Sequence, residues 1–192
     1  WFRFGEQVLD YFADQNAYNL VFAPHVMLFQ RKLLASVEHR LLRFRQRIDP
    51  RYARFDHIHI DTGSPRSVDM TYTNAADIYL GDVSSQIYEF IRKPRPAIFL
   101  NSHDAQWRGN PNYEHWTFGP VLDDPAGLEA ALAAVRPLPE EYRQTQTRAF
   151  AYSFDRENPD PPSQRAAAAI ADGRFDSQIV PGVRLDLRKQ SL

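Results

Sequence analysis

The chain contains no cysteine among its 192 residues, which excludes a disulfide framework and thiolate chemistry. No apolar run approaches the roughly 20 residues that a membrane-spanning helix needs. An excess of one charge is also missing, because 23 basic and 24 acidic side chains leave a net charge of -1. This balance gives no electrostatic reason to expect nucleic-acid binding, although a small anionic ligand needs only a local field. These absences favour a cytoplasmic protein.

Several common catalytic motifs are missing as well. The sequence has no Gly-x-Gly-x-x-Gly, no Walker lysine motif, no Gly-x-Ser-x-Gly elbow and no His-Glu-x-x-His. Each motif places a cofactor, a phosphate, a nucleophile or a metal in a defined way. Their absence weakens the dehydrogenase, ATPase, hydrolase and metalloprotease interpretations.

The residues that are present favour an α/β fold. A hydrophobic content of 43% is enough for a substantial core. Apolar spacing and turn residues predict helices over 1–15, 29–47, 67–76, 85–92, 124–135, 139–150 and 163–171, and strands over 18–23, 57–60, 78–80, 96–100 and 119–122. We expect Phe2, Val8, Leu9 and Phe12 to form the apolar face of the first helix, and Ser67 to cap the helix that it begins. Alternating strands and helices predict a Rossmann-like parallel sheet with helices on both faces.

The predicted organisation is one domain with a short appendage. Residues 1–150 carry the alternating pattern, and residues 151–192 read as a C-terminal helix and tail without a strong pattern beyond Gly173. The chain begins at Trp1 and enters a predicted helix directly. We therefore expect it to be a fragment of a longer protein.

Residues 77–89 are the most informative stretch, since they read as a buried strand, a tight turn and a helix start. Strand ends that feed helix N-termini hold phosphate in many α/β proteins. We expect Gly81 to allow an unusual backbone conformation, and Ser84 and Ser85 to add hydroxyl donors. Glu89 follows one turn after Ser85, where its carboxylate could accept hydrogen bonds from a sugar diol. A purely structural explanation is also open: the serines could simply cap the helix, and Glu89 could pair with Lys93.

Histidines give weaker signals. His25 directly follows a predicted strand, where imidazole could donate to a phosphate or carry a proton, or simply pair with backbone. The long polar and aromatic loop over 102–119 contains His103, Asp104 and His115 as candidates for substrate contact. His57 and His59 share one face of a strand, but no third ligand follows at a characteristic spacing, so we expect no metal.

The run Asn-Ala-Ala-Asp-Ile-Tyr-Leu-Gly-Asp-Val-Ser-Ser-Gln-Ile-Tyr-Glu-Phe, with Lys93-Pro94 before the next apolar strand, resembles the C-terminal half of CDP-glycerol glycerophosphotransferases. These are teichoic-acid polymerase-like enzymes with a GT-B fold. The strand end Phe-Ala-Pro-His25 resembles the family's histidine turn. The resemblance covers roughly residues 18–135. Two positions depart from it: Val83 replaces a tyrosine, and Val26 stands where the family has proline.

The resemblance implies a donor site for a CDP- or UDP-activated molecule. By it, the phosphates would be bound by Gly81, Asp82, Ser84, Ser85 and Gln86, the ribose by Glu89, and His25 would be catalytic. Such enzymes transfer glycerophosphate or glycosyl groups in cell-envelope polymer synthesis and need no cofactor. Helix dipoles, N–H groups and basic side chains neutralise the leaving diphosphate.

The family also implies what this chain would need besides itself. The acceptor, and usually the catalytic base, come from an N-terminal Rossmann-like half, so we expect this chain to bind donor nucleotide and to turn nothing over alone. Family members work at the inner face of the cell membrane, which suggests peripheral association for a full-length parent protein.

Two alternatives stay open. UDP-N-acetylglucosamine 2-epimerases share the architecture, but they have Gly-Gly where this chain has Ser84-Ser85. A non-catalytic nucleotide-binding module would keep the fold and lack the chemistry. The donor base and the transferred group are not decided by the residues.

Overall fold

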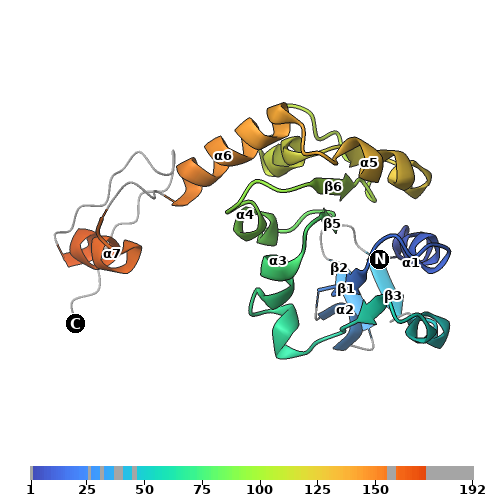
Figure 1. The fold of residues 1–192 in the computed structure, drawn as a ribbon. Helices are drawn as coiled ribbons and strands as arrows, with labels where there is room; N and C mark the ends of the chain where they lie inside the picture. Colours follow the sequence, from blue (N-terminus) through green and yellow to red (C-terminus); the bar gives the residue numbers. More distant parts are fainter. Residues whose placement is uncertain are drawn as a thin grey trace, which may run out of the picture. The chain divides into compact units, whose positions relative to one another are not determined.

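The computed structural model describes residues 2–25, 27–30, 33–36, 41–44, 47–154 and 159–171. The chain divides into two compact units, Trp1–Ser153 and Phe154–Leu192. Figure 1 shows helices and strands alternating through the first unit. The predicted α/β class is confirmed.

Parallel strands form two small sheets in the described residues of the first unit. β1 (Leu20–Phe22) pairs with β4 (Ile58–Ile60), and β6 (Ala97–Leu100) lies between β5 (Tyr79–Gly81) and β7 (Val121–Leu122). All five lie where strands were predicted, and their ends agree within two residues. Parallel pairing therefore agrees with a Rossmann-like arrangement.

The helices that cover these strands are mostly short. The α-helices are α1 (Gly5–Ala13), α2 (Met27–Gln30), α3 (Thr71–Ala75), α4 (Gln86–Phe90), α5 (Leu128–Ala134) and α6 (Glu140–Phe154), with α7 (Pro162–Ala171) in the second unit. Short 3-10 helices are η1 (Pro50–Arg54), η2 (Pro65–Ser67), η3 (Pro111–Phe118) and η4 (Pro125–Gly127). Asp124 accepts from the N–H of Ala126 and so caps η4, as the Asp-Asp-Pro sequence predicted.

The predicted helix over 29–47 is wrong. In its place, α2 is followed by an antiparallel hairpin of β2 (Leu33–Ser36) and β3 (Leu41–Phe44), with Leu33 opposite Phe44. Residues 31–32, 37–40 and 45–46 of the predicted helix lie outside the described residues. Apolar pairs eight residues apart fit a helical spacing, but they equally fit two short paired strands.

The predicted helix over 67–76 is also corrected. Ser64, not Ser67, caps the first turn by accepting from the N–H of Arg66, and the Ser67 hydroxyl donates to the carbonyl of Ser64. A separate helix, α3, begins after Met70, whose φ is 65°. A left-handed residue cannot continue a right-handed helix, so the segment breaks into two short turns.

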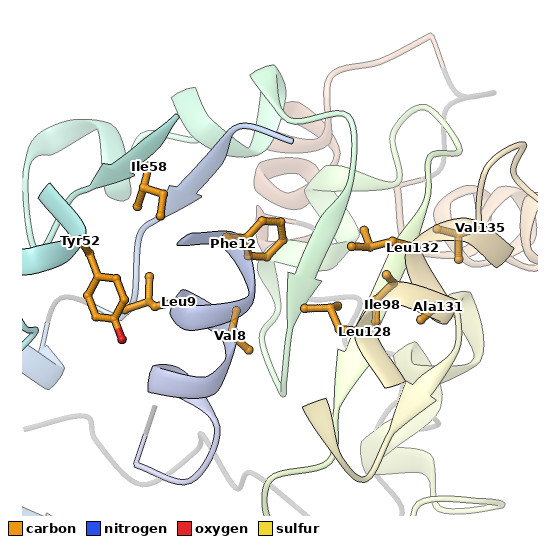
Figure 2. Close-up of a cluster of buried hydrophobic side chains, with 10 residues drawn as sticks. All are labelled: Val8, Leu9, Phe12, Tyr52, Ile58, Ile98, Leu128, Ala131, Leu132 and Val135. Carbon is orange, nitrogen blue, oxygen red and sulfur yellow. The ribbon is translucent and has the colours of Figure 1, made fainter. Parts of the chain in front are cut away.

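One hydrophobic core joins the two parallel sheets of the first unit. Figure 2 shows α1 between Tyr52 and Ile58 on one side and Ile98 with the α5 side chains on the other. As predicted, Val8, Leu9 and Phe12 of α1 are buried, whereas Phe2 precedes the helix and is half-buried. Side chains alternate along β6, so Ile98 joins this core while Phe99 packs against Tyr79 and Trp116 on the opposite face.

Arg95 and Gln146 fix the helices around the start of β6. The Arg95 guanidinium donates to carbonyls at the ends of α3 and α4, including Thr73 at 3.2 Å and Phe90 at 2.6 Å. The buried Gln146 amide of α6 donates to the carbonyls of Arg95 and Phe118, each at 2.9 Å, and accepts from the Arg95 N–H at 2.9 Å. These bonds satisfy backbone groups that neighbouring helix ends would leave unpaired.

Gly119, directly after η3, allows the backbone to pass close to the start of β6. A Cβ atom at this position would lie 1.9 Å from the carbonyl oxygen of Ala97. Only glycine fits this approach, and it holds the end of η3 beside the sheet.

No helix of the described residues has the length and apolar content needed to cross a membrane.

Candidate functional site

The turn between β5 and α4 leaves the carboxyl edge of the three-stranded sheet. Gly81 is paired with Phe99, so the chain leaves β5 and β6 at the same edge. Residues 82–85 follow β5, and the loop that begins at Asn101 follows β6. This edge is where open parallel sheets place their ligands.

Gly81 has a different role from the predicted one. It lies within β5, and the glycines with positive φ in the described residues are Gly63 and Gly109. A Cβ atom on Gly81 would lie 2.7 Å from the Tyr79 hydroxyl oxygen and 2.8 Å from the ring carbon that bears it. Gly81 is therefore needed for space, because the Tyr79 ring folds back over it.

Tyr79 connects this strand to the turn. Its ring packs against Phe90 and Phe99, with centroids 5.6 Å and 6.0 Å away. Its hydroxyl lies near the Ser84 side chain. Burial raises the pKa of Tyr79 to about 12, with a smaller opposing effect of the Ser84 hydrogen bond, so the phenol stays neutral at physiological pH.

The two serines have different environments. The Ser84 hydroxyl oxygen accepts from the N–H of Gln86 at 3.3 Å and meets Tyr79, so Ser84 acts as a structural cap. Ser85 is exposed and makes no cap hydrogen bond. Among the described residues, no acceptor is found for the backbone N–H groups of Val83, Ser84 and Ser85. The turn thus presents unpaired donors and one free hydroxyl.

The other predicted ligand residues lie on or near this turn. Glu89 is exposed one turn after Ser85, while Asp82 and Gln86 are half-buried. The side chain of Val83 is 49% exposed at the middle of the turn. Proximity in sequence accounts for this grouping.

Two residues of η3 reach the turn and were not predicted to do so. The buried Trp116 indole N–H donates to the carbonyl of Asp82 at 3.1 Å. The neighbouring His115 imidazole lies near the same residue. Partly buried aromatic rings surround Trp116, with Tyr113 at 4.8 Å and Trp107 at 6.1 Å between centroids. The sequence indicated only an aromatic-rich loop over 102–119, and this pattern does not predict which residues the loop contacts.

His115 is the most unusual titratable group of this region. The residue is 7% exposed, and its ring lies 5.9 Å from Phe99 and 6.3 Å from Trp116 between centroids. Its Nε2 atom is buried without a hydrogen-bond partner. Burial lowers the pKa of His115, and the nearby Asp82 partly offsets this effect, so the imidazole is neutral at pH 7.

The loop after β6 is organised by a buried asparagine. The Asn101 amide donates to Asp123 at 2.7 Å and accepts from the N–H of Ala105 at 2.8 Å. Asp104, a predicted substrate residue, pairs with Arg3 at 2.7 Å and is 72% exposed. His103 is exposed on the same loop.

His25 belongs to a different sheet from the turn. It is exposed and follows β1, and its carbonyl accepts from the N–H of Leu28 at the start of α2. The described contacts do not bring its imidazole into the turn between β5 and α4.

A second polar turn follows β4. The Asp61 carboxylate accepts from the N–H groups of Gly63 at 2.9 Å and Ser64 at 2.7 Å, from the Ser64 hydroxyl and from the Tyr72 hydroxyl at 2.7 Å. Hydrogen bonds from Ser64, then those from Gly63 and Tyr72, hold the pKa of Asp61 well below its usual value. The polar groups around this carboxylate are therefore paired within the turn.

The two strand histidines are engaged with protein atoms. His57 Nε2 lies 2.8 Å from the carbonyl of Phe12, and His59 Nε2 lies 3.0 Å from the Tyr72 hydroxyl. Because the single Tyr72 proton goes to Asp61, His59 Nε2 carries the proton in their shared bond. Within the described part of the chain, no group of three or more His, Cys, Asp or Glu side chains could hold a metal ion.

In comparisons with known proteins, no family model, curated protein or solved structure matches this chain.

Proposed function

We propose that the turn between β5 and α4 binds the phosphates of a nucleotide-activated donor. The observation that carries the proposal is the set of unpaired groups on the turn: the Ser85 hydroxyl and the N–H groups of residues 83–85. Clustered N–H groups at the end of a parallel strand suit phosphate oxygens. The exposed Glu89 is available to a ribose diol one turn later.

The chain acts as the donor-binding half of a GT-B-type transferase in this proposal. Its support is the sequence resemblance to CDP-glycerol glycerophosphotransferases together with parallel strands of the first unit. The transferred group is a glycerophosphate or a sugar, and the donor carries cytidine or uridine diphosphate. His25 acts on the donor when a second Rossmann-like half closes over the site. A full-length parent works at the inner face of the cell membrane.

Nucleotide binding is the property of this chain that can be measured directly. Thermal-shift and calorimetric titrations use CMP, CDP-glycerol, UDP and UDP-N-acetylglucosamine. We expect stabilisation by the ligands of one base, and a roughly tenfold weaker affinity in Ser85→Ala, since one hydrogen bond to a charged ligand is worth about 1.5 kcal/mol.

A matched control shows whether the loss of affinity is specific to Ser85 or follows from removing any exposed serine. Ser153→Ala removes an exposed serine on α6 and should leave nucleotide affinity unchanged. A chain that binds none of the four ligands at millimolar concentration contradicts the proposal. Binding without any transfer after an acceptor-binding half is supplied favours the non-catalytic module.

A further inference from the structure

Partly exposed aromatic rings lie at the same sheet edge as the proposed phosphate turn. The loop after β6 carries Trp107 and η3 carries Tyr113, and both residues are half-buried. Both rings pack against the buried Trp116, with centroids 6.1 Å and 4.8 Å from its own. Trp116 therefore belongs to the interior, whereas Trp107 and Tyr113 leave aromatic surface open to water. Aromatic surface that a loop leaves open in this way is typical of a binding site.

One hydrogen bond joins these rings to the turn. The Trp116 indole N–H donates to the carbonyl of Asp82, the first residue after β5, at 3.1 Å. Trp116 thus contacts both the backbone of the turn and the Trp107 ring, so Trp107 lies one ring away from the turn. The loop that carries Trp107 also leaves the sheet at the same edge as the turn. A nucleotide has phosphate at one end and a planar base at the other, which matches a phosphate turn with an aromatic ring beside it.

Trp107 is the more suitable of the two rings for a charged planar ligand. Its indole offers a larger flat surface than the Tyr113 phenol. The guanidinium of Arg108, an exposed residue, lies 4.6 Å from the centroid of the Trp107 ring. A cation beside the ring favours a ligand that carries negative phosphates together with a planar group.

We propose that Trp107 stacks against the base of the nucleotide whose phosphates the turn binds. The inference rests on the proposed function, because it adds a base-binding residue for the same ligand. Every nucleobase has a planar face, so stacking adds affinity without choosing between cytosine and uracil. Trp107 therefore favours nucleotides over phosphate compounds that lack a base, and it does not select the base.

The direct test observes the stacked pair in the wild-type chain, so it does not depend on a variant that folds. The chain is saturated with CDP or UDP, and NMR is used to detect nuclear Overhauser contacts between the base protons and the indole protons of Trp107. We expect these contacts together with shifts of the Ser85 amide. Saturation of the Ser85 amide without contacts to Trp107 would overturn the inference and leave the proposed function standing. A chain that binds neither nucleotide would overturn both.

Substitutions with paired ligands supply an independent readout. Trp107→Leu removes the flat ring and should weaken CMP or UMP, whichever the wild type binds, about tenfold. The same variant should bind ribose 5-phosphate, which has no base, as the wild type does in an NMR titration of the Ser85 amide. Trp107→Phe keeps an aromatic face and should retain most of the nucleotide affinity. Equal losses for the ligands with and without a base would contradict stacking.

Tyr113→Leu is the matched control for loosening around Trp116. It also removes a half-buried ring that packs on Trp116, but it leaves Trp107 in place. We expect nucleotide affinity to fall in Trp107→Leu and to stay unchanged in Tyr113→Leu. An equal fall in both variants would show that the two rings only hold Trp116 against the turn, and would overturn the inference.

Discussion

Two turns follow parallel strands in this protein, and they differ in how their polar groups are paired. After β4, Asp61 collects two N–H groups and two hydroxyls, so the polar groups around it are engaged. After β5, the N–H groups of residues 83–85 and the Ser85 hydroxyl have no partner among the described residues. A turn that pairs its own groups stabilises the fold, whereas a turn that leaves donors unpaired can bind an anion.

The largest expected effect comes from opening the paired turn. Asp61→Ala removes the acceptor of four hydrogen bonds and leaves the Tyr72 hydroxyl and the Ser64 N–H without their partner. Thermal denaturation should show a melting temperature several degrees lower. Nucleotide affinity at temperatures where the variant is folded should be unchanged, and a loss of affinity there would break the comparison.

The next effect comes from crowding the strand that leads into the unpaired turn. Gly81→Ala forces a methyl group against the Tyr79 ring, which Phe90 and Phe99 hold in place. We expect destabilisation by about 2 kcal/mol in urea denaturation. The double variant Gly81→Ala with Tyr79→Leu should recover part of this loss, and no recovery would mean that the ring is not the obstacle.

Urea denaturation should also show that the two serines of the turn contribute differently to the free energy of unfolding. Ser84→Ala removes the cap on Gln86 and should cost about 1 kcal/mol of unfolding free energy. Ser85→Ala removes an exposed hydroxyl and should change stability by less than about 0.5 kcal/mol. Equal costs for both substitutions would contradict the assignment of Ser84 as cap and Ser85 as ligand group.

The smallest expected effect is the change in thermal stability at acidic pH. Hydrogen bonds lower the pKa of folded Asp61 below its unfolded value of about 3.9. Its contribution to stability is therefore complete above that value and is lost as pH falls through the lower, folded pKa. The melting temperatures of wild type and Asp61→Asn should differ most at pH 6, and the difference should begin to shrink as pH falls below about 4. A difference that stays constant down to pH 2 would show that folding does not lower the pKa of Asp61.

Local pattern predicted the strands well because buried parallel strands are short apolar runs. Ala97–Leu100 is such a run between turn residues, and it forms β6 as expected. The same approach failed for residues 29–47, where short apolar pairs fit both a helix and the hairpin of β2 and β3. Pairing across a hairpin is a tertiary choice that spacing does not reveal.

The candidate site was predictable only in its local part. Residues 81–89 are adjacent in sequence, so their grouping followed from the strand, turn and helix order. The contact between Trp116 and Asp82 joins residues 34 positions apart, and no local signal pairs them. Likewise, we expected Gly81 to allow an unusual backbone conformation, but glycine is required there because the Tyr79 ring leaves no space for a Cβ atom.

The comparison of the two turns can be tested most directly by following backbone amides during nucleotide titration. The account predicts that CDP or UDP shifts the NMR resonances of the Val83, Ser84 and Ser85 amides, and leaves those of Gly63 and Ser64 unchanged. Saturating shifts at Gly63 and Ser64 without shifts at 83–85 would contradict it.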